Sequence, residues 1–213
     1  MTRPRRIVVG ITGASGTIFG IRALDMLGAL GVERHLVVSR AAELTRAHET
    51  DISREELNGL AEYVYPLANV GAAIASGSFR CLGMLVAPCS MRTLAEIATG
   101  LSSSLLTRAA DVTLKERRPL VLMTREAPLH AVHLRNMLTV TELGGIIHPP
   151  VPAFYTKPST IEDIVEHSVA RALDAFGLEV ASLPRWGETI PTIGSTRQGS
   201  RKDISMTSTE ENS

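Results

Sequence analysis

The segment from Ile7 to Gly20, which reads Ile-Val-Val-Gly-Ile-Thr-Gly-Ala-Ser-Gly-Thr-Ile-Phe-Gly, constrains the fold of this chain more than any other. Its β-branched run predicts a strand, its small residues predict a tight loop, and the pattern after the loop predicts a helix. Such a junction presents free backbone N–H groups and the positive end of a helix dipole, so it attracts phosphate. We expect Ser15 to cap this helix. We also expect the glycines of the loop to let the backbone approach a ligand: Gly10, Gly13, Gly16 and Gly20.

The spacing of these glycines disfavours two common nucleotide sites. A dinucleotide fingerprint needs Gly-x-Gly-x-x-Gly, whereas this loop reads Gly10-x-x-Gly13-x-x-Gly16. A Walker A loop needs a lysine at its end, and here Thr17 follows Gly16. A mononucleotide such as FMN fits better. The alternative is a strand-to-helix turn whose glycines serve packing only.

Composition places the chain among ordinary soluble globular proteins. It has 213 residues, of which 44% are hydrophobic and 21% are charged. Lysines plus arginines balance acids at 22 each, so no global field draws the chain to nucleic acid or to a membrane. We find no apolar stretch of about 20 residues and expect no transmembrane helix. Cys81 and Cys89 are expected to be buried free thiols, which favours the cytoplasm.

Apolar strand-like runs alternate with helical patterns along the chain. The expected strands are Ile7–Ile11, His35–Val38, Leu82–Ala87, Pro119–Met123 and Gly145–His148. The expected helices are Thr17–Leu30, Ala41–His48, Thr93–Thr99, Ser103–Glu116, Leu129–Leu143 and Thr160–Phe176. Continuous apolar strands between helices indicate a mostly parallel sheet covered on both faces. The sequence therefore predicts a doubly wound, Rossmann-like α/β domain with three α/β/α layers.

The chain is expected to hold one FMN-binding α/β domain over residues 1–186. From Gly187 onward Gly, Ser, Thr and charged residues dominate, and no aromatic residue remains. Such a composition cannot bury enough apolar surface to fold. We therefore expect residues 187–213 to form a disordered or loosely attached tail.

Polar residues follow several of the expected strands. They are Gly13-Ala14-Ser15 after the first strand, Ser39-Arg40 after the second, Pro88 to Thr93 after the third and Thr124-Arg125-Glu126 after the fourth. Because ligands of doubly wound sheets lie outside the carboxyl ends of the strands, we expect these residues to share one crevice. Ser39 taken alone is more simply explained as a helix cap.

Two further groups could suggest other chemistry. His130 and His133 lie about one helical turn apart, a spacing that can bind metal, but no third ligand can be placed beside them. Cys89 could be imagined as a nucleophile, but its apolar neighbours favour an inert buried thiol. We therefore expect no metal site and no thiol catalysis.

Several motifs together resemble one known family. They are Gly13-Ala14-Ser15-Gly16, His48-Glu49-Thr50-Asp51, Ser76-Gly77-Ser78-Phe79, Ala87-Pro88-Cys89-Ser90-Met91, Leu106 to Val112, Lys115 to Leu120 and Pro149 to Tyr155. On these residues the chain, from about Arg5 to Trp186, resembles the UbiX-like flavin prenyltransferases, long described as polyprenyl-hydroxybenzoate or aromatic-acid decarboxylases.

The resemblance implies a reaction, its substrates and its partners. Such proteins join the dimethylallyl group of dimethylallyl monophosphate to reduced FMN at N5 and C6, without a metal. The product, prenylated FMN, is passed to a UbiD-type decarboxylase. The family usually forms a dodecamer with active sites at subunit interfaces.

The resemblance also implies roles for residues of this chain. The implied FMN-binding residues are Gly13, Ala14, Ser15, Ser39, Ser90, Met91, Arg92, Thr93 and Arg125. The implied residues for the allylic phosphate are Lys115, Tyr155 and Arg171. The implied catalytic residues are Ser15 near N5, Glu49 and Glu126 for proton movement, and Trp186 over the allyl group.

Two other functions remain open at this point. One is an FMN-dependent decarboxylase acting directly on an aromatic acid, or, as a weaker form, on a cysteine-containing substrate. Relatives of the weaker form carry a catalytic histidine early in the chain, where this chain has His48 followed by Glu49-Thr50-Asp51. The other is a non-catalytic flavin-carrier subunit of a decarboxylase system.

Overall fold

The computed structural model describes residues 5–181, 183 and 185–187 of the chain. It divides into two units, Met1–Leu183 and Pro184–Ser213. The first unit holds all the helices and strands given below. Residues 188–213, where we predict a disordered tail, lie outside the described residues, so that prediction is untested.

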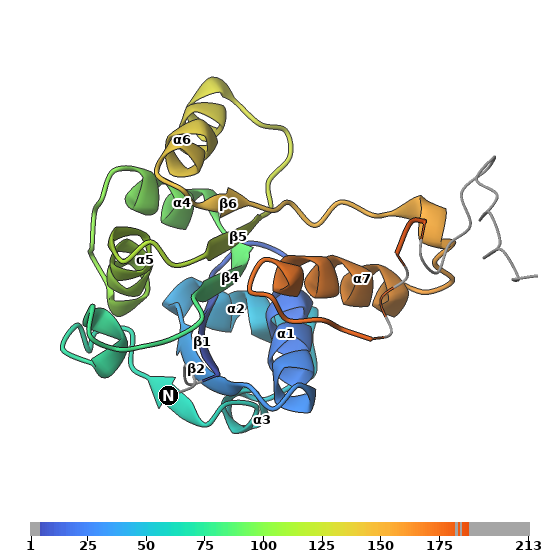
Figure 1. The fold of residues 1–213 in the computed structure, drawn as a ribbon, viewed down its shortest axis with the longest axis horizontal. Helices are drawn as coiled ribbons and strands as arrows, with labels where there is room; N and C mark the ends of the chain where they lie inside the picture. Colours follow the sequence, from blue (N-terminus) through green and yellow to red (C-terminus); the bar gives the residue numbers. More distant parts are fainter. Residues whose placement is uncertain (1–4, 182, 184, 188–213) are drawn as a thin grey trace, which may run out of the picture. The chain divides into compact units, whose positions relative to one another are not determined.

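Among the described residues, a six-stranded sheet runs through the first unit in the order β3-β2-β1-β4-β5-β6 (Figure 1). The strands are β1 Arg6–Ile11, β2 Glu33–Val38, β3 Tyr63–Tyr65, β4 Met84–Cys89, β5 Leu120–Thr124 and β6 Ile146–Ile147. Every neighbouring pair is parallel. This is the strand order of a doubly wound Rossmann sheet, so the predicted fold class is confirmed.

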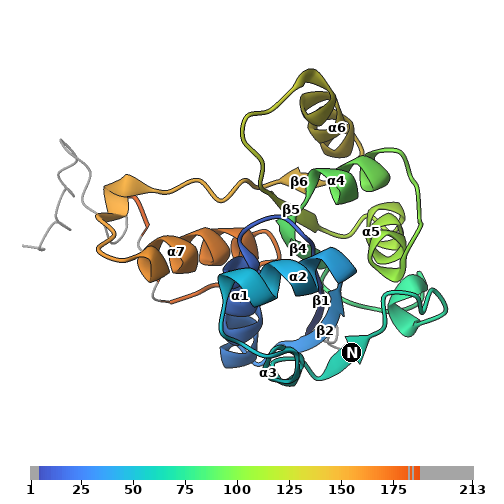
Figure 2. The ribbon, with the colours of Figure 1, turned by 180° about the vertical axis from the view of Figure 1, so that it is seen from behind.

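Helices cover both faces of this sheet. They are α1 Thr17–Ala29, α2 Arg40–Glu49, α3 Arg54–Gly59, α4 Met91–Ala98, α5 Leu105–Lys115, α6 Ala131–Glu142 and α7 Ile161–Asp174. Figure 2 shows α1, α2 and α3 beside β1 and β2, whereas α4, α5 and α6 lie beside β4, β5 and β6.

The alternation of side chains along each strand builds the two cores. Ile7, Val9 and Ile11 of β1 pack into a cluster with buried residues of α1 and α7. Val8, one residue away, points into the other cluster, which α4 and α5 complete. Because successive strand residues face opposite sides, a strand covered on both faces must be apolar throughout. This explains the unbroken apolar runs of the sequence.

One strand and one α-helix were not predicted. Strand β3 is a short edge strand whose Tyr63 and Val64 are exposed, so no apolar run announces it. Helix α3 begins with a capping box in which Ser53 accepts a hydrogen bond from the Glu56 N–H and Glu56 accepts one from the Ser53 N–H. The Ser-x-x-Glu spacing was the signal that could have identified α3.

Candidate functional site

The glycine-rich loop does not have its predicted cap. Helix α1 begins at Thr17, its N-cap is Gly16, and no side chain of the N-cap bonds to the helix. Gly16 has a φ of 109°, in the left-handed region that favours glycine. The prediction that Ser15 caps α1 is therefore wrong, because the chain turns through Gly16 between Ser15 and the first helical residue.

The carboxylate of Glu49, the last residue of α2, takes the place of a cap. Its Oε2 accepts hydrogen bonds from the Gly16 N–H at 2.9 Å and from the Thr17 N–H at 3.0 Å. Burial acts to raise the pKa of Glu49, but the Ser15 hydroxyl and these two N–H groups outweigh it and hold the pKa below its usual value. Glu49 is therefore an ionised acceptor that orients the Ser15 hydroxyl.

All four glycines of the Ile7–Gly20 segment approach protein atoms, and Gly13 in the loop and Gly20 in α1 do so most closely. A Cβ at Gly13 would lie 2.4 Å from the Cβ of Ala41, and a Cβ at Gly20 would lie 2.4 Å from the Ala87 carbonyl oxygen. Their small size lets α2 and β4 pack against the loop and α1. The expectation that each glycine opens the backbone to a ligand is thus wrong for Gly20, whereas Gly13 also lines the cavity described next.

A cavity of about 410 Å³ lies beside this loop. Its lining includes Gly13, at the carboxyl end of β1, and Ser90, at the carboxyl end of β4. Strand order reverses between these two strands, and that crevice is where doubly wound sheets bind ligands. Predicted residues that line the cavity are Gly13, Ser39, Ser90, Arg92 and Thr93.

The starts of α2, α4 and α5 meet at this cavity, each with a serine N-cap. The Ser39 Oγ accepts from the Ala42 N–H at 3.1 Å, and the Ser90 Oγ accepts from the Thr93 N–H at 3.3 Å. Ser104 forms a capping box with Thr107 at the start of α5. Helix starts carry partial positive charge, so their convergence creates a positive potential in the cavity.

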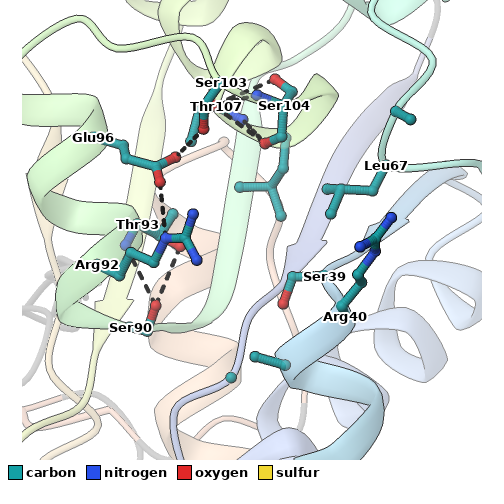
Figure 3. Close-up of a pocket in the computed structure, with 14 residues that line it drawn as sticks. Ser39, Arg40, Leu67, Ser90, Arg92, Thr93, Glu96, Ser103, Ser104 and Thr107 are labelled. Carbon is teal, nitrogen blue, oxygen red and sulfur yellow. Dashed lines mark hydrogen bonds and ion pairs between the residues drawn. The ribbon is translucent and has the colours of Figure 1, made fainter.

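Two arginines add formal charge at the rim. Figure 3 shows Arg40, next to Ser39, across the cavity from Arg92 and Ser90. The Arg92 Nε donates to Glu96 at 3.0 Å, and the Ser103 hydroxyl donates to the same carboxylate at 2.8 Å. Sequence patterns did not identify Glu96, Ser103 and Ser104, although a Ser-Ser pair directly before a helical pattern is a recognisable cap signal.

A buried threonine fixes the position of Ser90. The Thr12 Oγ1, at the end of β1, donates to the Pro88 carbonyl at 2.8 Å and accepts from the Ser90 N–H at 2.8 Å. Thr12 is 1% exposed, so these bonds are shielded from water. The end of β1 and the start of α4 are therefore held in register. Thr12 was not among the residues predicted for the site.

Other predicted residues do not line the cavity of one chain. They are Ala14, Ser15, Met91, Arg125, Glu126 and Glu49. Ser15 and Glu49 flank the loop, as described above. Arg125 and Glu126 follow β5; the Arg125 N–H donates to the Cys89 carbonyl at 3.2 Å, and the Glu126 Oε1 accepts from the Ala127 N–H at 3.1 Å. Both side chains are exposed.

Tyr155 and Arg171 both lie near His167 of α7. The Tyr155 hydroxyl lies 3.4 Å from the His167 Nε2, and His167 is 8% exposed. The pKa of His167 is lowered first by burial and then by the charge of Arg171, one turn along the helix. Arg171 itself pairs with Asp174. A phenol and a guanidinium thus lie near one neutral histidine.

Lys115 lies at the last residue of α5, whereas the cavity is lined by residues before and in the first turn of that helix. Thr107 is the last residue of α5 that lines the cavity, and Lys115 lies eight residues further on, which is about 12 Å along the helix axis. One chain alone does not bring all the predicted substrate residues together. Trp186 belongs to the second unit, so its predicted closing role stays a prediction.

Cys89 is fully buried, as predicted, and burial raises the pKa of its thiol far above the usual value. Cys81 is only partly buried, so the predicted burial is wrong for that residue. His130 and His133 stack with ring centroids 3.5 Å apart. In the part of the chain that the structure describes, no group of three or more metal-ligating residues occurs.

Known proteins are similar to this chain over most of its length. The Flavoprotein family matches residues 1–173. The chain is 58% identical over 182 residues to a protein of Neisseria meningitidis named flavin prenyltransferase UbiX. The alignment covers 85% of this chain and 96% of the relative.

Two solved structures are also similar. AnUbiX (PadA1), in complex with FMN and dimethylallyl pyrophosphate, has a TM-score of 0.85 and 52% identity, covering 86% of this chain and 98% of its own. A dodecameric FMN-dependent UbiX-like decarboxylase of Escherichia coli O157:H7 has a TM-score of 0.83 and 48% identity. The match covers 85% of this chain and 98% of that structure's chain.

Proposed function

This chain belongs to the UbiX-like flavin prenyltransferase family, and we propose on that basis that it transfers the dimethylallyl group of dimethylallyl monophosphate to reduced FMN. The observation that carries the proposal is the convergence of three serine-capped helix starts and two arginines on one cavity of the described chain. Such a cavity favours an anionic ligand.

The residues of this cavity fit FMN. Its volume of about 410 Å³ lies in the range of about 300–1,000 Å³ usual for small-molecule sites. Ser39, Ser90 and Ser104 supply hydroxyls, and Arg40 supplies positive charge for a phosphate monoester, whereas the charge of Arg92 is partly offset by Glu96. Leu67 and Leu106 supply apolar surface for a flat ring.

When bound, reduced FMN supplies the N5 and C6 positions that take up the five-carbon unit. Gly13, Ala14 and Met91 would contact it through their backbones, and Thr93 and Arg125 through their side chains. Ser15, hydrogen-bonded to the ionised Glu49, would hold its hydroxyl toward N5. Because the low pKa of Glu49 makes it a weak base, we assign it the orientation of Ser15 rather than proton removal.

The allylic phosphate needs positive charge as its C–O bond breaks. Lys115, Arg171 and the Tyr155 hydroxyl would bind it and stabilise the charge that develops on the leaving group. Glu126, whose carboxylate is exposed, would accept the proton released during ring closure. Trp186 would cover the allyl group and exclude water. Since Lys115 and the cavity lie apart in one chain, we propose a site shared between copies in a dodecamer.

The test is to incubate the protein with reduced FMN and dimethylallyl monophosphate and to measure the mass of the extracted flavin by mass spectrometry. A mass gain of one prenyl unit is expected. A parallel reaction with dimethylallyl pyrophosphate, the compound named for AnUbiX, establishes which phosphate ester is the donor. Unchanged flavin with both esters would contradict the proposal.

The same samples test the other functions. Release of carbon dioxide from an aromatic acid with the flavin unchanged would instead identify a decarboxylase. Bound flavin with neither reaction would identify a flavin carrier. The observation against thiol chemistry is the full burial of Cys89.

We further propose that prenylated FMN passes to a UbiD-type decarboxylase in the cytoplasm. Co-incubation with such a decarboxylase lacking its cofactor should restore its activity. Across the described residues, we find no helix with the length and apolar character needed to cross a bilayer.

A further inference from the structure

The side chain of Lys115 is 47% exposed, but its ammonium is held from one side by neighbouring residues, which we call the Lys115 socket: Glu116, Arg118 and Gly77. The Lys115 Nζ donates to the Glu116 Oε1 at 2.5 Å. The other carboxylate oxygen of Glu116 faces the Arg118 guanidinium at 3.9 Å. These contacts make a chain of charges in which Glu116 lies between two cations.

Arg118 is fixed on the backbone of a neighbouring turn, Ser76–Phe79. Its NH2 donates to the Gly77 carbonyl at 2.8 Å, and its NH1 donates to the Phe79 carbonyl at 2.6 Å. The turn is closed by a bond of 3.1 Å from the Phe79 N–H to the Ser76 carbonyl. The Arg118 side chain is only 18% exposed, so this anchor is well packed.

Gly77 leaves the space that the Lys115–Glu116 pair fills. A Cβ at position 77 would lie 2.3 Å from the Glu116 Oε1 and 2.7 Å from the Lys115 Nζ. Both contacts are with the ends of flexible side chains, and Gly77 does not have a left-handed backbone. An alanine there would displace the ammonium and the carboxylate while the turn itself stays intact.

We infer that Glu116, Arg118 and Gly77 are positioning residues that hold the Lys115 ammonium for the phosphate of the allylic substrate. The inference rests on the proposed function, in which Lys115 binds that phosphate. A free lysine side chain loses rotamer entropy when a ligand orders it. The socket orders it beforehand, and one N–H of the ammonium bonds to Glu116 while the other two remain available for phosphate oxygens.

The experiment compares Gly77→Ala, Glu116→Gln and Lys115→Met in the full chain. Each variant should raise the KM for dimethylallyl monophosphate by about tenfold while the Kd for FMN changes less than about twofold. Gly59→Ala is the matched control, because a Cβ at that position would meet no atom within 4 Å, and its KM should equal that of the wild type.

The decisive readout is Gly77→Ala combined with Lys115→Met. If Gly77 acts through the ammonium, the double variant has the KM of Lys115→Met alone; a further rise would mean a structural role and would overturn the inference. If Gly77→Ala and Glu116→Gln have the wild-type KM while Lys115→Met has a raised KM, the positioning role is contradicted. The proposed function is then still supported. Absence of prenyl transfer by the wild type overturns both.

Discussion

At the scale of single residues, Glu49 differs most from what the sequence predicted. The motif His48–Asp51 identified it as part of the site, but nothing in the sequence places a carboxylate from the end of α2 on the N–H groups of Gly16 and Thr17. That contact joins residues more than 30 positions apart, and only the packing of α2 against Gly13 creates it. Local patterns therefore predicted a Ser15 cap that the tertiary structure replaces.

Removal of the Ser15 hydroxyl should slow catalysis without loss of flavin. We expect Ser15→Ala and Glu126→Gln to bind FMN as the wild type does and to prenylate it about 100-fold more slowly. Ser15→Ala loses the hydroxyl held toward N5, and Glu126→Gln loses the carboxylate that accepts the proton. Stopped-flow absorbance of the reduced flavin measures the rate, and fluorescence titration measures binding. Wild-type rates in both variants would remove their catalytic assignment.

Glu62 should make stability depend on pH in the acid range. The Arg34 guanidinium bonds to Glu62 and, against the effect of burial, lowers its pKa to about 2. A carboxyl whose pKa falls on folding stabilises the protein above its unfolded pKa of about 4.5, and this stabilisation is lost as the pH falls toward about 2. We expect Glu62→Gln to cost about 1 kcal/mol at pH 7, because the pair is partly exposed.

Urea unfolding at several pH values measures this contribution. The difference between the wild type and Glu62→Gln should shrink steadily from pH 5 downward. Glu55→Gln, at an exposed position in the first turn of α3, serves as the control. A difference that stays constant down to pH 2 would show that the ion pair does not contribute.

At the scale of elements, the sequence predicted most helices and strands to within a few residues, because their apolar periodicity is strong. The predicted Thr17–Leu30 and observed Thr17–Ala29 are an example. Cavity residues at the ends of strands were also foreseen, since parallel strands end at the same edge of a sheet. Ser104 and Glu96 were not, because their helices contribute to the cavity only through packing.

The serine caps around the cavity should serve both stability and binding. We expect Ser90→Ala and Ser104→Ala each to cost about 1 kcal/mol of unfolding free energy and to weaken FMN binding, because both hydroxyls line the cavity. Ser53→Ala removes a similar cap from α3, away from the cavity, and should lose stability alone. Denaturant melts and FMN titrations of the three variants give both quantities. Equal FMN affinity in all three would exclude a binding role for the caps.

At the scale of the whole molecule, the alternation of apolar runs and helices predicted the fold. It did not predict whether one chain brings all the site residues together. Sequence motifs give no distances, so Lys115 and Ser90 were placed in one predicted site. In the structure Ser90 lines the cavity at the start of α4, whereas Lys115 lies at the far end of α5 from that cavity. The resemblance implies a family with active sites at subunit interfaces, and the separation of these residues in one chain agrees with such a shared site.

A shared site predicts complementation between two impaired variants, assayed at a dimethylallyl monophosphate concentration far below the KM of Lys115→Met. Chains with Lys115→Met and chains with Ser15→Ala, refolded together, should recover part of the wild-type rate, because some sites then receive an intact residue from each chain. The refolded single variants are the controls, and prenylated flavin is the readout. No recovery in mixtures of proven mixed composition would place both residues in the same chain's site.

The carboxylate beneath the first loop has a consequence for ligand choice. A dinucleotide in a doubly wound fold rests its pyrophosphate on the first helix start. Here that start already holds a negative ion of the protein's own, Glu49, which would repel a second one. A molecule with a single anionic end directed toward the other helix starts avoids this repulsion. Glu49 thus favours FMN, which has one phosphate group, over a dinucleotide at this loop.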